Sequence, residues 1–275
     1  MQRLRRHFLL LRLLLIITLL AWPVVGHADH DDMTLESVWD DFGDMLAAPF
    51  NMSSEEAIAT AAVAGVTGAF IFKFDEDVER LRIQHAHDLP YVVIHKMAEL
   101  GAWYGKNDRN ALYAAIAVTG SMGLASWIGD DAYLRRTTAI MVESYVFTMV
   151  ITGATTMIIG RDRPYTESGA RHFNWFGFSR TRDHRSLPSG HTASAFSLAT
   201  VAAQRYPDWW VAVPSYTVAT SIGFERFDRG HHWVSDVIIG GALGYAVSSF
   251  LVNRHTGDEH DQRANPAYVQ ITFGF

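Results

Sequence analysis

Apolar segments of helical length follow one another along most of the chain, separated by polar connections. After residue 55 they lie at 56–72, 91–104, 111–128, 138–159, 192–203, 209–223 and 233–252. Apolar segments of this length are typical of helices rather than strands. Most of the connections are short, which favours antiparallel neighbours. The pattern therefore predicts an all-α protein built as a helical bundle.

The pattern leaves open whether these helices cross a membrane. The mean hydropathy of the chain is close to zero, which is low for a protein made mostly of spanning helices. The segment 56–72 is marginal as a span, because about 20 residues are needed to cross a bilayer squarely. Glu143 interrupts the apolar segment 138–159. In a membrane this carboxylate would need a partner, whereas a soluble bundle would accommodate it easily.

Residues 1–28 form a segment of a different kind. Four arginines precede or interrupt the apolar run LLLIITLLAW, and small residues follow at Gly26 and Ala28. This is the pattern of a signal peptide that is removed on export, with an uncleaved membrane anchor as the alternative. Removal changes the net charge from −6 to −10, because the segment holds four arginines and no acidic residue. An acidic mature chain argues against nucleic-acid binding.

The rest of the chain divides into three predicted parts. Residues 29–55 are acidic with hydrophobic positions at helical spacing, and they predict an N-terminal amphipathic segment. Residues 56–252 form the helical domain, in which the charged stretch 73–88 is expected to be a solvated connection or an exposed helix. Residues 253–275 form a polar C-terminal tail that ends in one strand-like alternation. The absence of cysteine excludes disulfides and thiolate metal sites.

Reactive side chains stand at the predicted start of the last long helix. His232 and Asp236 are four residues apart, so they are expected to share one helix face. A carboxylate one turn from an imidazole can accept the proton of one ring nitrogen, which leaves the other nitrogen free to attack or to bind a metal. The neighbouring His231 lacks such a partner. Taken alone, this spacing also fits an ordinary helix start.

Arginines gather just after the segment 138–159. Arg161 and Arg163 follow Gly160, and Pro164 then prevents the helix from continuing. Cations at this position also complement the helix dipole, so a structural interpretation is open as well. The following loop, 165–185, alternates arginines with aromatic residues, and loops of such length are usually functional.

A candidate anion site lies at the end of that loop. Ser189, Gly190 and His191 immediately precede the segment 192–203. The free backbone N–H groups of a first helical turn attract an anion, and glycine allows an oxyanion to approach the backbone closely. His191 would stand at the mouth of this site.

Chain topology connects these separate features. One cluster follows the segment 138–159, one precedes 192–203, one follows 209–223 and one begins 233–252. In an up-down arrangement all four positions lie at the same end of the bundle. The predicted fold is therefore an all-α helical bundle with the active site at one end of the core helices, where six residues meet: Arg161, Arg163, His191, Arg226, His232 and Asp236.

Three motifs resemble a known family. They are RDRP at 161–164, SLPSGH at 186–191 and R-x5-H-x3-D at 226–236. Together they are similar to the three-part signature of the type 2 phosphatidic acid phosphatase and vanadium haloperoxidase superfamily. The resemblance covers roughly residues 138–252. It implies an all-α bundle, a phosphohistidine mechanism, and no cofactor or metal.

The resemblance also implies a role for each matching residue. His232 would be the nucleophile, Asp236 its orienting partner and His191 the general acid. The phosphoryl oxygens would be held by Arg163, Arg226 and the segment Ser189–Gly190, and Arg161 is a further candidate for phosphate binding.

Two positions depart from the family signature. Thr156 stands where the family has a lysine, and Glu225 stands where a small residue is usual. The lost cation would weaken transition-state stabilisation by about a few kcal/mol unless another group replaces it. Arg161, His184 and Arg185 are the candidates for such a replacement.

The expected activity is hydrolysis of phosphate monoesters. Lipid phosphates such as phosphatidate, or an isoprenoid or glycerolipid phosphate, are the expected substrates, and a small phosphomonoester is the alternative. The expected location is the periplasmic side of the inner membrane, in a soluble or an embedded form. A vanadate-dependent haloperoxidase and a catalytically impaired member with a binding role are the competing hypotheses.

Overall fold

The computed structural model describes residues 34–179 and 181–256. The predicted signal peptide at 1–28 and most of the predicted tail lie outside the described residues. The helices are α2 (Leu35–Ala47), α3 (Ser54–Ala69), α4 (Asp75–Gln84), α5 (Tyr91–Gly105), α6 (Asp108–Ile128), α7 (Ala132–Ile159), α8 (Gly190–Arg205), α9 (Trp209–Asp228) and α10 (Val234–Thr256). Within these ranges there is no strand, so the all-α prediction is confirmed.

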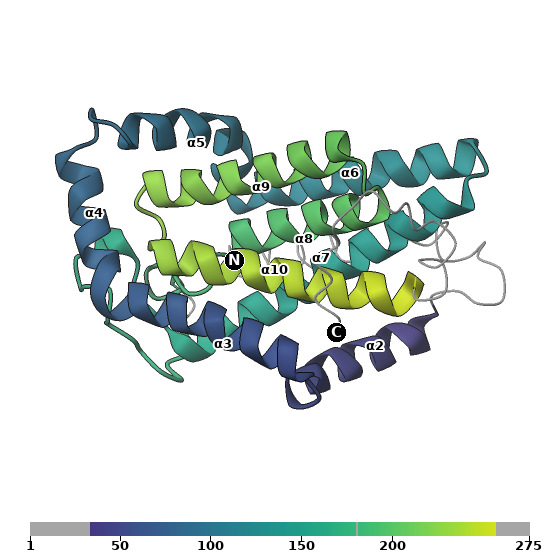
Figure 1. Cartoon of the computed structure of the whole chain (residues 1–275), viewed down its shortest axis with the longest axis horizontal. Helices are drawn as coiled ribbons and strands as arrows, with labels where there is room; N and C mark the ends of the chain where they lie inside the picture. Colours follow the sequence, from purple (N-terminus) through teal and green to yellow (C-terminus); the bar gives the residue numbers. More distant parts are fainter. Residues whose placement is uncertain (1–33, 180, 257–275) are drawn as a thin grey trace, which may run out of the picture.

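Helix α8 lies at the centre of the bundle. It packs against α7, α9 and α10, and α5 covers part of α9 on the outside (Figure 1). Consecutive helices from α6 to α10 alternate in direction, as predicted, although the long segment 160–189 separates α7 from α8. The end of α7 and the starts of α8 and α10 therefore lie at one end of the bundle.

Glycines bring the backbones of α8 and α10 into contact. A Cβ atom on Gly244 would lie 2.1 Å from the carbonyl oxygen of Ala193, and one on Gly240 would lie 2.6 Å from that of Ser189. Any larger residue would push the helices apart. This close approach fixes the start of α8, which bears the SGH sequence, against the start of α10.

The amphipathic helix predicted within 29–55 is confirmed as α2. A capping box at Thr34 and Ser37 begins it. Its apolar face packs against the core of α7, α8 and α10, where Phe42 makes an edge-on contact with Phe147 at 5.0 Å between ring centroids. The amphipathic pattern alone was enough to predict this packing.

Helices α3 and α4 form one continuous helix with a π-helical turn at Phe70–Phe74. Such a turn inserts one residue and changes which side chains face inward. Asp75 follows it directly and is only 1% exposed. The expectation that all of 73–88 is solvated or exposed is therefore wrong for Asp75, because the turn directs this carboxylate into the bundle.

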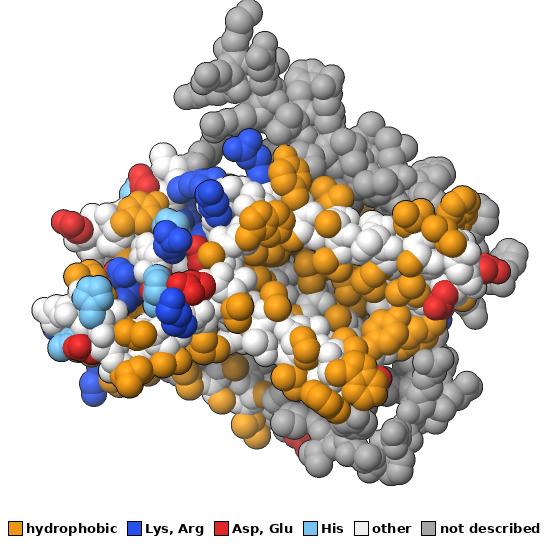
Figure 2. Space-filling view, turned by 90° about the horizontal axis from the view of Figure 1, so that it is seen from above, with side chains coloured by type: hydrophobic (Ala, Val, Ile, Leu, Met, Phe, Trp, Pro, Cys, Tyr) orange, Lys and Arg blue, Asp and Glu red, His pale blue; other side chains and the backbone are white. Residues whose placement is uncertain are grey.

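Within the described residues, four helices are long and apolar enough to cross a membrane. They are Ser54–Gln84, Asp108–Ile128, Ala132–Ile159 and Val234–Thr256. Figure 2 shows hydrophobic side chains spread over most of one face, whereas charged and histidine side chains gather at the end where α4 and α5 meet. By length and composition these helices indicate a membrane protein rather than a soluble one.

Candidate active site

Four segments converge at the charged end of the bundle. Arg163 follows α7, His191 lies in the first turn of α8, Arg226 lies near the end of α9, and His232 lies between α9 and α10. The charges of Arg163 and Arg226 both lower the pKa values of the two histidines, which shows that the four side chains are electrostatic neighbours. The convergence predicted from topology is thus present in the structure for these residues.

His232 is held in one tautomer by a backbone carbonyl. Its Nδ1 atom lies 2.8 Å from the carbonyl oxygen of Ser186. A carbonyl oxygen only accepts hydrogen bonds, so Nδ1 must be the protonated ring nitrogen. The lone pair of the ring is then on Nε2. The position of His232 differs from the expected one, because the residue precedes α10 instead of lying on its first turn.

Asp236 does not hold His232 in the expected way. Its nearer carboxylate oxygen lies 3.7 Å from Nδ1 of His232, which is too far for a hydrogen bond. The carboxylate instead accepts hydrogen bonds from the backbone N–H of Trp233 at 2.9 Å and from the hydroxyl of Ser186. Its backbone carbonyl accepts one from Ser189 at 2.9 Å. Asp236 therefore joins the SLPSGH segment to α10, and it orients His232 through Ser186.

Arg161 is part of this scaffold and does not face an open site. Its side chain is 0% exposed. The guanidinium donates to the carbonyl of Ala170 at 2.9 Å, to Asp236 at 2.6 Å, to Asp75 at 2.7 Å and to the hydroxyl of Ser235. Because these partners use four of its five N–H donors, the expectation that Arg161 binds phosphate does not fit this geometry.

Asp75 is a site residue that the sequence analysis missed. Besides its ion pair with Arg161, it accepts a hydrogen bond from the backbone N–H of Ser235 at 3.1 Å. Its partners are 86 and 160 residues away in the chain. The local sequence around Asp75 does not predict these contacts, because Asp75 belongs to an acidic run in which the two following residues are exposed.

Asp162 supports the loop on the other side of Arg161. Its carboxylate contacts Nδ1 of His172 at 2.9 Å and Nδ1 of His184, and its backbone carbonyl accepts a hydrogen bond from the indole of Trp233 at 2.8 Å. These contacts tie the long loop to the start of α10. His184 is therefore engaged by Asp162, which argues against it as the replacement for the missing lysine.

Arg163 and Arg226 are the two arginines that lie close to His191 and His232. The Nε atom of Arg163 is buried and has no hydrogen-bond partner among the described residues, although Nη2 lies 3.3 Å from the carbonyl of Arg185. Arg226 donates from Nε to Glu225 at 2.6 Å. Burial lowers the pKa of both guanidiniums and raises that of the Glu225 carboxyl. Glu225, one of the two departures from the family signature, thus neutralises part of the charge of Arg226.

Arg185 occupies the place beside Thr156. Its Nε and Nη2 atoms both lie 3.4 Å from the hydroxyl oxygen of Thr156. Of the three candidates for the missing cation, Arg161 and His184 are engaged elsewhere. Arg185 is the cation that lies against the position of the family lysine.

The start of α8 presents free backbone N–H groups. No side chain caps this helix, because the hydroxyl of Ser189 is buried and lies 2.9 Å from that of Thr192 instead of accepting from the first turn. The first N–H groups of a helix have no partner within the helix and attract anions. The segment Ser189–Gly190 would therefore contact an anion through its backbone.

Burial keeps both site histidines neutral near pH 7. Burial first, and then the charge of Arg163, lower the pKa of His232 to about 4. Burial and then the charge of Arg226 hold the pKa of His191 well below its ordinary value of 6.5. The Nε2 atom of His191 is buried without a hydrogen-bond partner in the part of the chain that the structure describes. A neutral His232 with a free Nε2 lone pair has the form that a nucleophile requires.

The family assignment follows from comparison of the sequence with known families. Residues 137–258 match the PAP2 superfamily. They belong to it. The matched range contains all three motifs and includes the whole of α10, so the resemblance inferred from the motifs is confirmed.

Two relatives of this PAP2 domain are informative. The lipid A 1-phosphatase of Porphyromonas gingivalis is 38% identical over 95 residues, which cover 30% of this chain and 21% of that protein. The chain thus matches about a fifth of the length of this curated relative. The crystal structure of a transmembrane PAP2-type phosphatidylglycerolphosphate phosphatase from Bacillus subtilis superposes with a TM-score of 0.52 at 17% identity. It covers 78% of this chain and 100% of its own, and it shows that the fold is shared.

Proposed function

We propose that this PAP2 protein is a phosphatase that hydrolyses phosphate monoesters through a phosphohistidine on His232. One observation supports this most directly. The carbonyl of Ser186 fixes the proton of His232 on Nδ1, which leaves Nε2 as the nucleophile. The free N–H groups at Gly190 and the guanidiniums of Arg163 and Arg226 supply the donors that the equatorial oxygens of a transferring phosphoryl group need.

The reaction would proceed in two steps. Nε2 of His232 attacks phosphorus, the bond to the ester oxygen breaks, and His191 gives its proton to the departing alkoxide. In the second step His191 takes a proton from water, which attacks the phosphohistidine and releases inorganic phosphate. His191 must be protonated for the first step. A bound phosphate dianion favours this, because its charge offsets those of the nearby arginines that lower the pKa of His191.

A lipid phosphate is the substrate class that the chain supports best. The relatives named above are phosphatases of lipid phosphates. In the part of the chain that the structure describes, four helices are able to span a bilayer, and the candidate site lies where α7 ends and α10 begins. A lipid anchored in the same membrane would present its phosphate at that level, whereas a soluble phosphomonoester would have to arrive from the aqueous phase.

A substrate panel tests this function. The full chain would be purified in detergent and assayed for phosphate release from phosphatidate, an isoprenoid phosphate and a water-soluble phosphomonoester. We expect release from at least one lipid phosphate and none from the His232→Ala protein. Peroxide-dependent halide oxidation on addition of vanadate, without phosphate release, would favour a haloperoxidase. Inactivity of a folded protein in both assays would favour an impaired member with a binding role.

The site would face the outer side of the inner membrane. The pattern of a signal peptide at 1–28 supports export, and the arginines near the site are explained by phosphate binding rather than by a cytoplasmic location. An alkaline phosphatase reporter fused after residue 40 is expected to be active outside the cytoplasm. An inactive fusion would contradict this orientation.

A further inference from the structure

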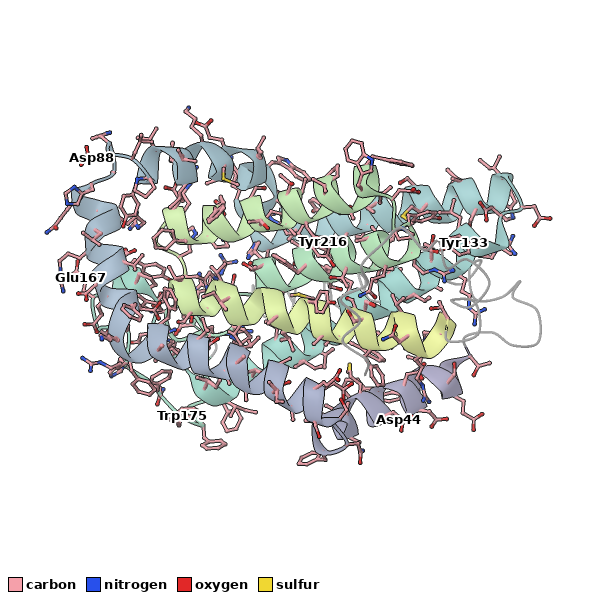
Figure 3. All side chains as sticks on the ribbon, in the orientation of Figure 1. Asp44, Asp88, Tyr133, Glu167, Trp175 and Tyr216 are labelled. Carbon is pink, nitrogen blue, oxygen red and sulfur yellow. The ribbon has the colours of Figure 1, made fainter. Side chains whose placement is uncertain are left out.

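A second cluster of ionisable side chains lies at the opposite end of the core. Asp41 on α2, Glu143 on α7 and His255 on α10 each direct one ligand atom to the same point, with these atoms within 4.8 Å of one another. His255 is in the last turn of α10, whereas Asp236 is in its first turn. The two residues are therefore about 30 Å apart along the helix. Figure 3 labels Asp44, which lies on α2 near this end of α10.

The cluster is buried and its oxygens are not fully used. The Nε2 atom of His255 lies 3.0 Å from Glu143 and 3.2 Å from Asp41. Asp41 is 2% exposed and Glu143 is 5% exposed. Oε1 of Glu143 is buried and makes no hydrogen bond within residues 34–179 and 181–256, and Oδ2 of Asp41 has Nε2 of His255 at 3.2 Å as a polar neighbour there without a hydrogen bond between them. Buried carboxylate oxygens without donors are costly, so these oxygens are suited to binding a cation.

The local charge points to a cation. Arg254 pairs with both Asp41 and Asp44 through different nitrogens. The three carboxylates of Asp41, Asp44 and Glu143 and the single guanidinium of Arg254 sum to a formal charge of −2. A divalent ion would balance this charge. Arg254 alone does not.

We propose that Asp41, Glu143 and His255 bind one divalent transition-metal ion, for which Zn²⁺ fits best. An imidazole nitrogen and two carboxylate oxygens are a common zinc donor set. Ligands at about 2.0–2.1 Å from zinc in a tetrahedron are about 3.3 Å apart, close to the two separations measured from His255. The cluster has no thiolate, which argues against metal ions that prefer sulfur ligands. It contains an imidazole, which argues against metal ions that prefer oxygen ligands alone.

The site would attach α2 to the core. Its three ligands come from α2, α7 and α10, so one ion joins an N-terminal helix that precedes the PAP2 domain to two helices within it. Glu143, which the sequence marked as a carboxylate needing a partner in a membrane, would then be a metal ligand. This proposal does not depend on the phosphatase chemistry at the other end of the bundle.

Zinc binding to the full chain tests the proposal. The protein would be purified in detergent with a tag free of histidine, stripped with a chelator, titrated with Zn²⁺ and analysed for bound metal. We expect Glu143→Gln and His255→Gln to weaken zinc binding by about tenfold or more, since each removes a direct ligand. We expect Zn²⁺ to raise the unfolding temperature of the parent protein but not of these variants.

Two control substitutions match the ligand variants. Asp44→Asn changes a carboxylate on the same helix that pairs with Arg254 but is not one of the three ligands. His95→Gln changes an exposed histidine that contacts Asp228. Both controls should keep the zinc site. Histidines outside the described residues, at 7, 27, 30 and 260, add zinc uptake that is equal in all the proteins and cancels in the comparison.

Cobalt provides a readout of direct ligation. Co²⁺ in a site of low coordination absorbs visible light, and we expect this absorption in the parent protein and its loss in Glu143→Gln. If the parent and Glu143→Gln bind equal zinc, or if cobalt gives no such absorption, the proposal is wrong. The cluster would then be held by a proton shared between His255 and the two carboxylates.

Discussion

The guanidinium of Arg185 lies against the hydroxyl of Thr156, with two of its nitrogens 3.4 Å from Oγ1. Thr156 stands where the motif inferred from the sequence has a lysine. An arginine from the loop before α8 thus lies beside this position of α7. We propose that Arg185 supplies a third positive charge to the phosphate site beside Arg163 and Arg226.

This arrangement predicts that restoring the lysine is not beneficial by itself. In Thr156→Lys the new ammonium would crowd Arg185, so phosphatase turnover and vanadate inhibition should stay level or fall. Arg185→Gln should lower turnover by about 100-fold, the usual effect of removing one donor to a transition-state oxyanion. The double variant should recover part of that loss. A clear gain in Thr156→Lys alone would show that Arg185 does not replace the lysine.

The two adjacent histidines should differ in their effect on turnover. His232→Ala is expected to abolish phosphatase turnover, because only His232 has its Nδ1 fixed by Ser186 and its Nε2 free to attack. His231→Ala should keep most of the activity, since its ring makes an edge-on contact with Tyr165 and it occupies an unspecified position of the third motif. Steady-state assays of both purified variants decide this. An equal loss in the two would contradict the assignment.

The pH profile should be acidic. Protonated His232 cannot attack, and its pKa of about 4 means that kcat/KM should fall on the acid side only as the pH drops through about 4. His191 must be protonated to act as the acid, and its pKa lies well below the ordinary value of 6.5. As the pH rises, kcat/KM should therefore already decline below pH 6.5. Tryptophan fluorescence would confirm folding at each pH. An acid limb near 6.5 would show that His232 is not buried beside arginines.

The ion pair of Asp75 with Arg161 should contribute to stability. Both side chains are 0% exposed, so Asp75→Asn removes one of the two buried carboxylates that pair with Arg161 and leaves Asp236 as the other. The expected loss in the free energy of unfolding is about 3–5 kcal/mol. Asp77→Asn is the matched control, because its pair with Arg80 is exposed and should contribute less than about 1 kcal/mol. Thermal unfolding in detergent measures both, and equal stability of the two variants would rule out the scaffold role.

Much of the fold was predictable because it follows from local pattern. The apolar segments gave the helices from α5 to α10, with ends displaced by a few residues. Alternating directions then placed Arg163, His191, Arg226 and His232 at one end. α10 continues to Thr256 instead of ending near 252, because the polar residues in its last turn have partners on α2 and α7.

The scaffold behind the site was not predictable in the same way. The burial of Asp75 depends on a π-helical turn, and nothing in a short sequence window distinguishes this acid from its exposed neighbours. Arg161 and Arg163 are two residues apart and chemically identical, yet only Arg161 is enclosed by acceptors from distant segments. His232 donates its hydrogen bond to a backbone carbonyl. Every residue has such a carbonyl, so the amino-acid sequence does not indicate which one accepts the bond.

Trapping the covalent intermediate tests the central claim most directly. The purified protein would be mixed with a lipid phosphate bearing ³²P, quenched in alkali within the first turnover, and digested for mass spectrometry. We predict phosphate on the imidazole of His232, no such label in His232→Ala, and accumulation of the label in His191→Ala when the leaving group needs no proton. Label on another residue, or turnover by the parent protein with no labelled histidine, would contradict the account.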